Sequence, residues 1–538
     1  MHHQLTLVLG LLAAVTALAS LGRRVGMPGP IAFALGGLAL ALVPGLPRVA
    51  MPPELVLLVF LPPLIFAAAQ GTTWGEVREL ARPIFLLAVG LVLATTAAVA
   101  VAARALLPGL PWAAAVALGA IVSPPDAVAA AAIVSRLPVP RRVVVILEGE
   151  SLVNDASALV LYRTAVAATV TGAFSWGESV VRFFLDAGVG TMLGLLVGWL
   201  IIRAARWTRD ALAETLLTLA GPYVAWTAAE SLHVSAVLAC VAGGLYTRQH
   251  LSTAVGAASR LQARSVWDLV VFLLNALIFL LLGVEFARLL PSVPPGALGP
   301  VLRTGAVIGL VAIVVRLVWV PVATITPRRV SRELRRRDPA PGWRPVFLVA
   351  WTSMRGIVSL ASALALPRAL ADGRPFPYRT EILLITMVVI LMTLVVQGLT
   401  LAPIIRAFRF APEPGRHEEE RLARREAARR GAEALADLSR EPCADPRDVE
   451  WLRRELGERA RLLALGGPEP AGRRRLRAEM IDAERRMLVR LRNEGAISDE
   501  VLGELEQELD HEAVRLGDGD ARPQERPAAR RRAPAGAR

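Results

Sequence analysis

The sequence predicts an all-α polytopic membrane protein of about thirteen transmembrane helices, with a helical tail outside the membrane. The chain has 538 residues, 54% of them hydrophobic, and the apolar residues form long, nearly uncharged blocks. A soluble chain of this length would expose far more polar surface. Many blocks reach the roughly 20 residues that an α-helix needs to cross about 30 Å of hydrocarbon.

The predicted spans occupy the first three quarters of the chain. They cover residues 4–20, 29–47, 53–70, 83–106, 112–134, 143–170, 178–202, 211–232, 234–247, 266–290, 300–326, 345–367 and 380–408. We therefore expect a transmembrane domain over residues 1–410. Thirteen spans also permit an inverted repeat of spans 1–6 in spans 8–13, a common plan in secondary transporters.

Residues 411–538 differ in composition and form a separate predicted region, the charged C-terminal tail. Arg, Glu, Ala and Leu dominate it, and their spacing predicts helices over residues 417–440, 446–464 and 473–512. The final stretch, 521–538, has the low complexity of a disordered segment.

The distribution of charge predicts the topology. Residues 1–410 hold 33 Arg against 18 Asp and Glu, although the chain as a whole has a net charge of +14. The excess lies in loops after the odd-numbered spans, from Arg23 and Arg24 to the Arg-rich 328–344. The positive-inside rule then places the N-terminus outside and the tail in the cytoplasm, and it explains the basic charge without a nucleic-acid partner. A signal-peptidase site after Ala19 is a competing interpretation, but translocating the two following arginines would be unfavourable.

Asp155 is one of four ionisable groups near the middle of a predicted span, where each costs roughly 2.5–3.5 kcal/mol on insertion scales. Ser151 and Asn154 lie within one helical turn of it, so one face presents a hydroxyl, an amide and a carboxylate. Hard oxygen ligands of this kind suit a small dehydrated cation. The alternative is a polar contact between helices, held by hydrogen bonds.

Asp126 follows Ser123, Pro124 and Pro125 in the middle of the fifth span. Two consecutive prolines remove backbone donors and break a helix. Unwound backbone at membrane depth is tolerated inside protein or along a watery cavity, so we expect Asp126 to face the ion path. The alternative is a kink in which Asp126 caps the new helix.

Two arginines, Arg355 and Arg316, also fall near mid-span. A guanidinium at that depth needs a carboxylate or several carbonyl groups as partners. We expect Glu150 to pair with Arg355, with Asp126 as the second candidate partner. Arg316 follows the same logic as a supporting residue.

Several chemistries have no sequence support. The chain shows no phosphate-binding Gly-rich loop, no nucleophile–base set and no metal motif. Its two cysteines, Cys240 and Cys443, build neither a disulfide framework nor a metal site. We therefore expect no enzyme activity and no cofactor. Transport would run on an ion gradient or downhill.

Four segments resemble the monovalent cation:proton antiporters of the bacterial NhaP and eukaryotic sodium/proton exchanger type. They are LPPLIFAAA at 61–69, SPPDAVAA at 123–130, ESLVNDASALVLY at 150–162 and MRGIVSLA at 354–361. The resemblance implies a homodimer in the bacterial inner (plasma) membrane, in which the fifth and twelfth helices of each subunit are unwound and cross near the ion.

The resemblance also implies residue roles. Asp155 would be the shared ligand of cation and proton, with Ser151 and Asp126 beside it. Asn154 stands where electrogenic relatives carry a second Asp, and Glu150 with Arg355 would form a structural ion pair. Ala67 replaces a Glu of many relatives and Pro125 replaces a Thr, which leaves the coordination and the Na⁺/K⁺ preference open.

The expected function is an electroneutral exchange of one Na⁺, K⁺ or Li⁺ for one H⁺ by alternating access. The alternatives are a K⁺-preferring exchanger in volume or pH control, a passive cation channel, and a non-transporting sensor. A pore would show rings of charge or a carbonyl filter, and neither pattern is present in the sequence.

Overall fold

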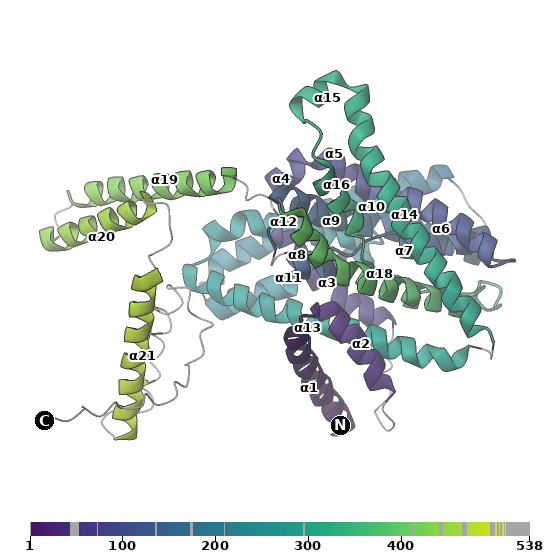
Figure 1. Ribbon diagram of the computed structural model, residues 1–538, viewed down its shortest axis with the longest axis horizontal. Coiled ribbons are helices and arrows are strands. Elements are labelled where there is room, and N and C mark those ends of the chain that lie inside the picture. Colours follow the sequence, from purple (N-terminus) through teal and green to yellow (C-terminus); the bar gives the residue numbers. More distant parts are fainter. Residues whose placement is uncertain are drawn as a thin grey trace, which may run out of the picture. The chain divides into compact units, whose positions relative to one another are not determined.

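The computed structural model is all-α, as the sequence predicts (Figure 1). It describes residues 2–512 apart from 43–52, 73, 135–136, 173–175, 209, 294–295, 411–413, 441–444, 465–470, 495–500, 503–504, 506–507 and 510–511. Within these residues there is no β-strand, and one isolated bridge joins Ala369 and Pro375. The predicted disordered end, 521–538, lies outside the described residues.

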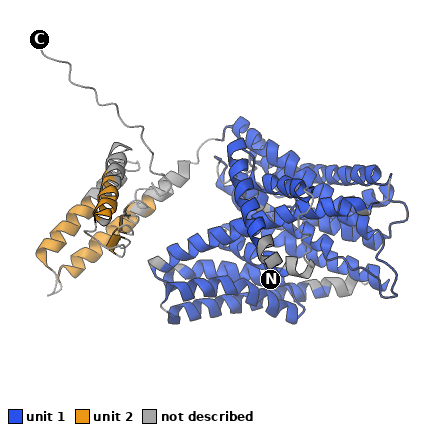
Figure 2. Cartoon of the chain, turned by 90° about the horizontal axis from the view of Figure 1, so that it is seen from below, with its two compact units in different colours: residues 1–412 blue, residues 413–538 orange. Residues whose placement is uncertain are grey.

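The chain divides into two compact units, Met1–Pro412 and Glu413–Arg538 (Figure 2). The helices of the first unit, with one π-helical turn (η1) and one 3₁₀ turn (η2), are α1 His2–Val25, α2 Gly29–Ala41, α3 Pro53–Gly71, α4 Trp74–Glu79, α5 Ala81–Phe85, η1 Leu86–Leu91, α6 Val92–Leu106, α7 Trp112–Val122, α8 Ala127–Val134, α9 Arg141–Thr171, α10 Trp176–Thr208, α11 Ala211–Ser231, α12 Ala236–Ala254, α13 Ala257–Leu289, η2 Leu290–Ser292, α14 Leu298–Val330, α15 Arg332–Arg337, α16 Trp343–Trp351, α17 Ile357–Leu364 and α18 Arg379–Phe408.

Each of the thirteen predicted spans overlaps at least one helix of the described residues. Six described helical segments are long and apolar enough to cross a membrane: Val8–Val25, Ala81–Leu106, Phe184–Thr208, Ser259–Leu289, Leu298–Val330 and Arg379–Phe408. The multi-span character is therefore confirmed, whereas the count of thirteen crossings stays a prediction.

Helix α14 shows how these helices divide their surfaces. Its exposed apolar side chains recur every three or four residues and include Leu310, Val314 and Val318. Its opposite face buries Ala312 and Arg316 against the rest of the unit. The exposed stripe has the periodicity of a helix face that meets lipid, and the buried face carries the polar group.

Small residues bring some helices into close contact. A Cβ on Gly37 of α2 would overlap the backbone of Leu280 in α13, and one on Gly283 would overlap Ala34. Packing without side chains between the backbones is typical of helices that associate in membranes.

Two predicted spans are interrupted where they carry their polar residues. Residues 123–126 are non-helical and separate α7 from α8, and residues 352–356 separate α16 from α17. The first interruption follows from Pro124 and Pro125, which lack the N–H groups that a continuous helix would need.

The second unit contains α19 Pro414–Leu438, α20 Pro446–Ala464 and α21 Ala471–Asn493. Salt bridges three or four residues apart line α19, such as Arg429 with Glu426 and with Glu433. Helix α21 ends at Asn493, and further helical residues at 501–502, 505, 508–509 and 512 also fall within the predicted range 473–512. Glycine at 495, two positions beyond Asn493, is an ordinary helix-stop signal in the sequence.

Candidate functional site

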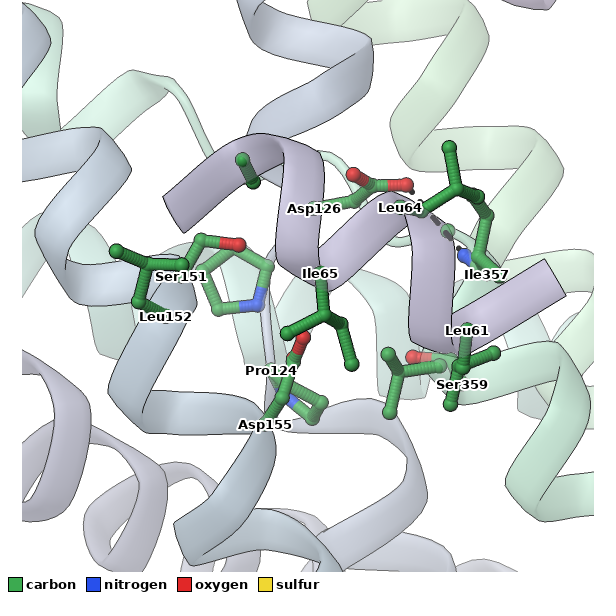
Figure 3. A pocket seen from close by; sticks show the side chains of 14 residues that line it. Leu61, Leu64, Ile65, Pro124, Asp126, Ser151, Leu152, Asp155, Ile357 and Ser359 are labelled. Carbon is green, nitrogen blue, oxygen red and sulfur yellow. Dashed lines mark hydrogen bonds between the residues drawn. The ribbon is translucent and has the colours of Figure 1, made fainter. Parts of the chain in front are cut away.

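Asp155 lies on α9, in the middle of the first unit. Helix α9 follows Pro140 and ends where Gly172 adopts a left-handed conformation, with φ of 74°. Asp155 is 8% exposed and lines a cavity of about 50 Å³ together with Ser151 and Asp126 (Figure 3). A cavity of this size has room for one or a few small particles, such as a water molecule or a monovalent ion.

The walls of this cavity come from four parts of the chain. Asp155, Ser151 and Leu152 belong to α9, and Pro124, Pro125 and Asp126 belong to the first interruption. Helix α3 contributes Leu61, Leu64, Ile65 and Ala68, and the second interruption with α17 contributes Gly356, Ile357, Val358 and Ser359. Polar oxygens therefore come from three of these four parts, whereas α3 contributes apolar side chains.

The first interruption leaves carbonyl groups without helical partners, and side chains satisfy several of them. Ser123 Oγ donates to the carbonyl of Ala120 at 3.1 Å. The Asn154 side-chain amide donates to the carbonyl of Pro125 at 3.4 Å, and Arg355 Nε donates to that of Val122 at 3.0 Å. The bond to Ala120 replaces the one that Pro124 cannot donate, and the other two satisfy carbonyl groups of the unwound segment and of the last turn of α7.

The two interruptions contact each other directly. The backbone N–H of Asp126 donates to the carbonyl of Met354 at 2.6 Å, and the N–H of Ile357 donates to Asp126 Oδ2 at 3.4 Å. A Cβ at Gly356 would overlap the Asp126 carboxylate, so this close approach requires glycine. Asp126 thus connects the start of α8 with the start of α17.

Each interruption places a charge against the helix ends of the other. The Asp126 carboxylate lies at the N-terminus of α17, where the helix dipole favours a negative group. Arg355 lies at the last carbonyl groups of α7, where the dipole favours a positive one. The Arg355 guanidinium also donates to the carbonyl and the hydroxyl of Ser353, and the backbone N–H of Arg355 donates to Thr393 Oγ1 at 3.1 Å.

The predicted pairing of Glu150 with Arg355 is wrong. Glu150 pairs with Arg316 of α14, whose Nη2 lies 2.7 Å from Glu150 Oε2 and whose Nη1 contacts Oε1. Arg316 also donates to the carbonyl of Val349 in α16, from Nε at 3.2 Å. Glu150, Arg316 and Arg355 are each 1% exposed. Counting along spans gives depth but no lateral neighbours, so it could not decide which arginine faces Glu150.

The structure divides the predicted residues into two groups. Asp155, Asp126, Ser151, Pro124 and Pro125 line the cavity, whereas Asn154, Glu150, Arg316 and Arg355 support the elements around it. The residue that replaces a Glu of many relatives, Ala67, is not among the lining residues.

One polar residue of the cavity was not predicted. Ser359 of α17 lines it, is 1% exposed, and its hydroxyl has no hydrogen-bond partner among the described residues. The signal in the sequence is its place in MRGIVSLA. Ser359 follows Gly356 by three residues, so the two lie on the same face of α17.

A wider cavity of about 550 Å³ lies along the other half of α9. It begins at Ala156, the residue after Asp155, and reaches Thr171. Arg163, Asp186 and Glu230 are its charged lining residues.

Comparison with known proteins identifies the family. Residues 10–407 match the family described as "Sodium/hydrogen exchanger, transmembrane". The chain is 35% identical over 527 residues to an uncharacterized Na⁺/H⁺ exchanger of Mycobacterium tuberculosis, covering 96% of each chain. It is 34% identical over 409 residues to a sodium, potassium, lithium and rubidium/H⁺ antiporter of Bacillus pumilus, covering 73% of this chain and 60% of that one.

A solved structure shares the fold. The sodium/proton antiporter MjNhaP1 of Methanocaldococcus jannaschii superposes with a TM-score of 0.58 at 19% identity, over 77% of this chain and 98% of that one. The family match extends over almost the whole first unit and includes both interruptions and α9. The chain therefore belongs to the sodium/hydrogen exchanger family.

Proposed function

We propose that this protein is a secondary active antiporter that exchanges Na⁺, with K⁺ and Li⁺ as further candidate substrates, for H⁺ across the plasma membrane. The observation that carries the proposal is the buried Asp155 in a small cavity between two interrupted helices. A buried carboxylate must be neutralised, and either a proton or a monovalent cation can do this.

Competition for Asp155 couples the two ions. When Asp155 holds a proton, it has no charge with which to bind a cation, and when it holds a cation, it cannot keep the proton. Asp126, Ser151 and Ser359 would supply further oxygen ligands to the dehydrated ion. If the empty, charged site cannot change sides, each transported cation requires a proton in return. No covalent chemistry and no cofactor is needed.

The architecture that we propose has thirteen spans in two inverted repeats. The two interruptions would be the unwound parts of equivalent helices, five and twelve, crossing beside the ion. Their mutual contacts through Asp126, Met354 and Ile357 support this arrangement. The N-terminus would lie outside and the second unit in the cytoplasm, and two copies would form a homodimer. Reporters fused after Gly172 and after Glu426 should read as periplasmic and cytoplasmic, respectively, and the opposite result would overturn this topology.

Transport can be tested with purified protein in proteoliposomes. A preset pH gradient should dissipate on addition of Na⁺, K⁺ or Li⁺, each tested in turn, and the order of rates would give the cation preference. Asp155→Asn should abolish the response. Because one exchangeable carboxylate moves one cation or one proton, a potential imposed with valinomycin should leave the initial rate of Na⁺-driven exchange unchanged. A voltage response would indicate a second proton carrier, for which Asp126 is the candidate.

A K⁺-preferring exchanger is the second candidate function. The relative of Bacillus pumilus is named as an antiporter of sodium, potassium, lithium and rubidium. Substitution of the family's Thr by Pro125 removes one hydroxyl from the cavity wall, and fewer ligands would favour a larger, more weakly hydrated ion. A passive channel fits less well, because the cavity beside Asp155 is small.

A further inference from the structure

We propose that Glu148 is a second cation-handling carboxylate, at the cytoplasmic mouth of the path to Asp155. The inference rests on the proposed exchange function and adds a residue that the substrate meets before it reaches the central site. The route of the cation from the cytoplasm would run between α3 and α9, past Glu148 and Ser151, to Asp155.

The position of Glu148 on α9 is the first argument. Glu148, Ser151 and Asp155 are three and four residues apart in turn, so they share one face of the helix. Ser151 and Asp155 line the cavity, and Glu148 continues their row toward Arg141 and Arg142. Their carboxylates are seven positions apart in sequence, which corresponds to about 10 Å along the helix axis.

The second argument comes from α3, the helix that faces α9 across the proposed route. Leu61, Leu64 and Ala68 of α3 line the cavity, and Thr72 lies one helical turn beyond Ala68. Thr72 Oγ1 donates to Glu148 Oε2 at 3.4 Å and to the carbonyl of Ala68 at 3.3 Å. The Glu148 carboxylate therefore lies between α9 and the end of α3, the two helices that also line the central cavity.

The charge of Glu148 is the third argument. Arg141, the first residue of α9, donates to both carboxylate oxygens of Glu76 at 2.8 Å. The hydrogen-bond partner of Glu148 is the neutral hydroxyl of Thr72, and Arg141, whose charge also reaches Glu148, is hydrogen-bonded to Glu76. Part of the negative charge of Glu148 is therefore left to attract a cation. Opening the path between α3 and α9 would break the bond to Thr72 and expose the carboxylate to the cytoplasm.

The test measures cation dependence separately on the two sides of the membrane. Everted vesicles present the cytoplasmic face to added Na⁺, and right-side-out vesicles present the outer face. Glu148→Gln should raise the apparent KM for Na⁺ on the cytoplasmic face roughly three- to tenfold, with little change in maximal rate or in the outer-face KM. The effect should shrink when N-methylglucamine chloride raises the ionic strength, because salt screens the attraction.

Three further variants separate charge from packing. Glu148→Asp keeps the charge and should retain most of the affinity. Thr72→Val removes the hydrogen bond but keeps the carboxylate, so it should change the KM much less than Glu148→Gln. Glu79→Gln removes the same charge at an exposed position of the same membrane face and serves as the matched control.

The proposal is overturned if Glu148→Gln, inserted at wild-type level, leaves both KM values unchanged or raises both equally. It is also overturned if Thr72→Val or Glu79→Gln reproduces the full effect. A wild-type protein that exchanges no cation for protons would reject the proposed function itself, whereas active wild type with an unaffected Glu148→Gln variant rejects the role of Glu148 alone.

Discussion

Arg316 donates hydrogen bonds to both carboxylate oxygens of Glu150, and neither side chain is more than 1% exposed. This pair joins α9, which carries Asp155, to α14. Arg316 also reaches the carbonyl of Val349 in α16, so three helices meet at one guanidinium. Removing either partner leaves an uncompensated charge inside the membrane domain, at a cost of about 3–5 kcal/mol.

The first prediction follows from this pair. Glu150→Ala and Arg316→Ala should each lower the melting temperature in detergent, and the double variant should lose less than the sum of the two. The cycle of Glu150→Ala with Arg355→Ala should show weaker coupling, because Arg355 hydrogen-bonds to Val122 and Ser353 instead. Additive losses for Glu150 and Arg316 would show that the pair contributes no interaction energy.

The second prediction concerns pH and the central carboxylate. Proton and cation compete for Asp155, so the apparent KM for Na⁺ should rise up to about tenfold per pH unit at acidic pH. The maximal rate at saturating Na⁺ should change little. At fixed Na⁺ the rate should fall again at high pH, where protons for the return step are scarce, which gives a bell-shaped profile. Stopped-flow measurement of proton release in proteoliposomes checks both limbs. A KM independent of pH would remove Asp155 from the exchange step.

The third prediction concerns Gly356. Gly356→Ala places a methyl group where the Asp126 carboxylate lies, so Asp126 must move or the two interruptions must separate. We expect overpacking to cost roughly 1–3 kcal/mol and exchange to drop strongly. Gly188→Ala in α10 is the matched control, because a Cβ there meets no atom within 4 Å. Equal activity of the two variants would contradict the close approach of Asp126 and Gly356.

The fourth prediction uses Asp338, in the loop between α15 and α16. Its carboxylate accepts from Arg328 at 2.6 Å, Arg142 at 2.7 Å and Arg82 at 3.0 Å. Burial alone would raise the pKa of Asp338, but the hydrogen bond from Arg142 and the charges of the three arginines together hold it below its ordinary value.

A lowered pKa means that the folded state favours the charged form of Asp338. The resulting stabilisation is present above the unfolded-state pKa of about 4 and is lost as the pH falls through the folded-state value. Asp338→Asn should therefore reduce the free energy of unfolding at pH 7 by roughly 1–2 kcal/mol, seen as a lower melting temperature. The difference from wild type should vanish in acid. Asp372→Asn, which removes an exposed pair with Arg374, should have a much smaller effect at every pH.

The fifth prediction concerns the second unit. A chain truncated after Pro412 keeps the whole first unit and should still exchange cation for protons. We expect its pH dependence to shift, since the charged helices of the tail suggest a regulatory role. Loss of exchange in truncated protein that is still inserted and folded would show that the second unit takes part in transport.

The sequence by itself determined the fold class and the central residues. Hydrocarbon cannot satisfy backbone groups or charges, so long apolar blocks imply helices, and the few polar groups within them indicate function. Asp155, Asp126, Ser151 and the proline pair were found in this way, and all of them line one cavity. The interruption at Pro124 and Pro125 is likewise local, because it follows from missing backbone donors.

Only the tertiary structure decided which groups meet. Glu150 lies in α9, Arg316 in α14 and Arg355 in the interruption between α16 and α17. The sequence pattern gives the depth of each residue along its span but not the helix that it faces. The observed pair depends on how α9 packs against α14 and α16, which is set by contacts far apart in the chain. The same holds for Ser359, Gly356 and the α3 wall, whose roles arise because packing brings four distant segments around one carboxylate.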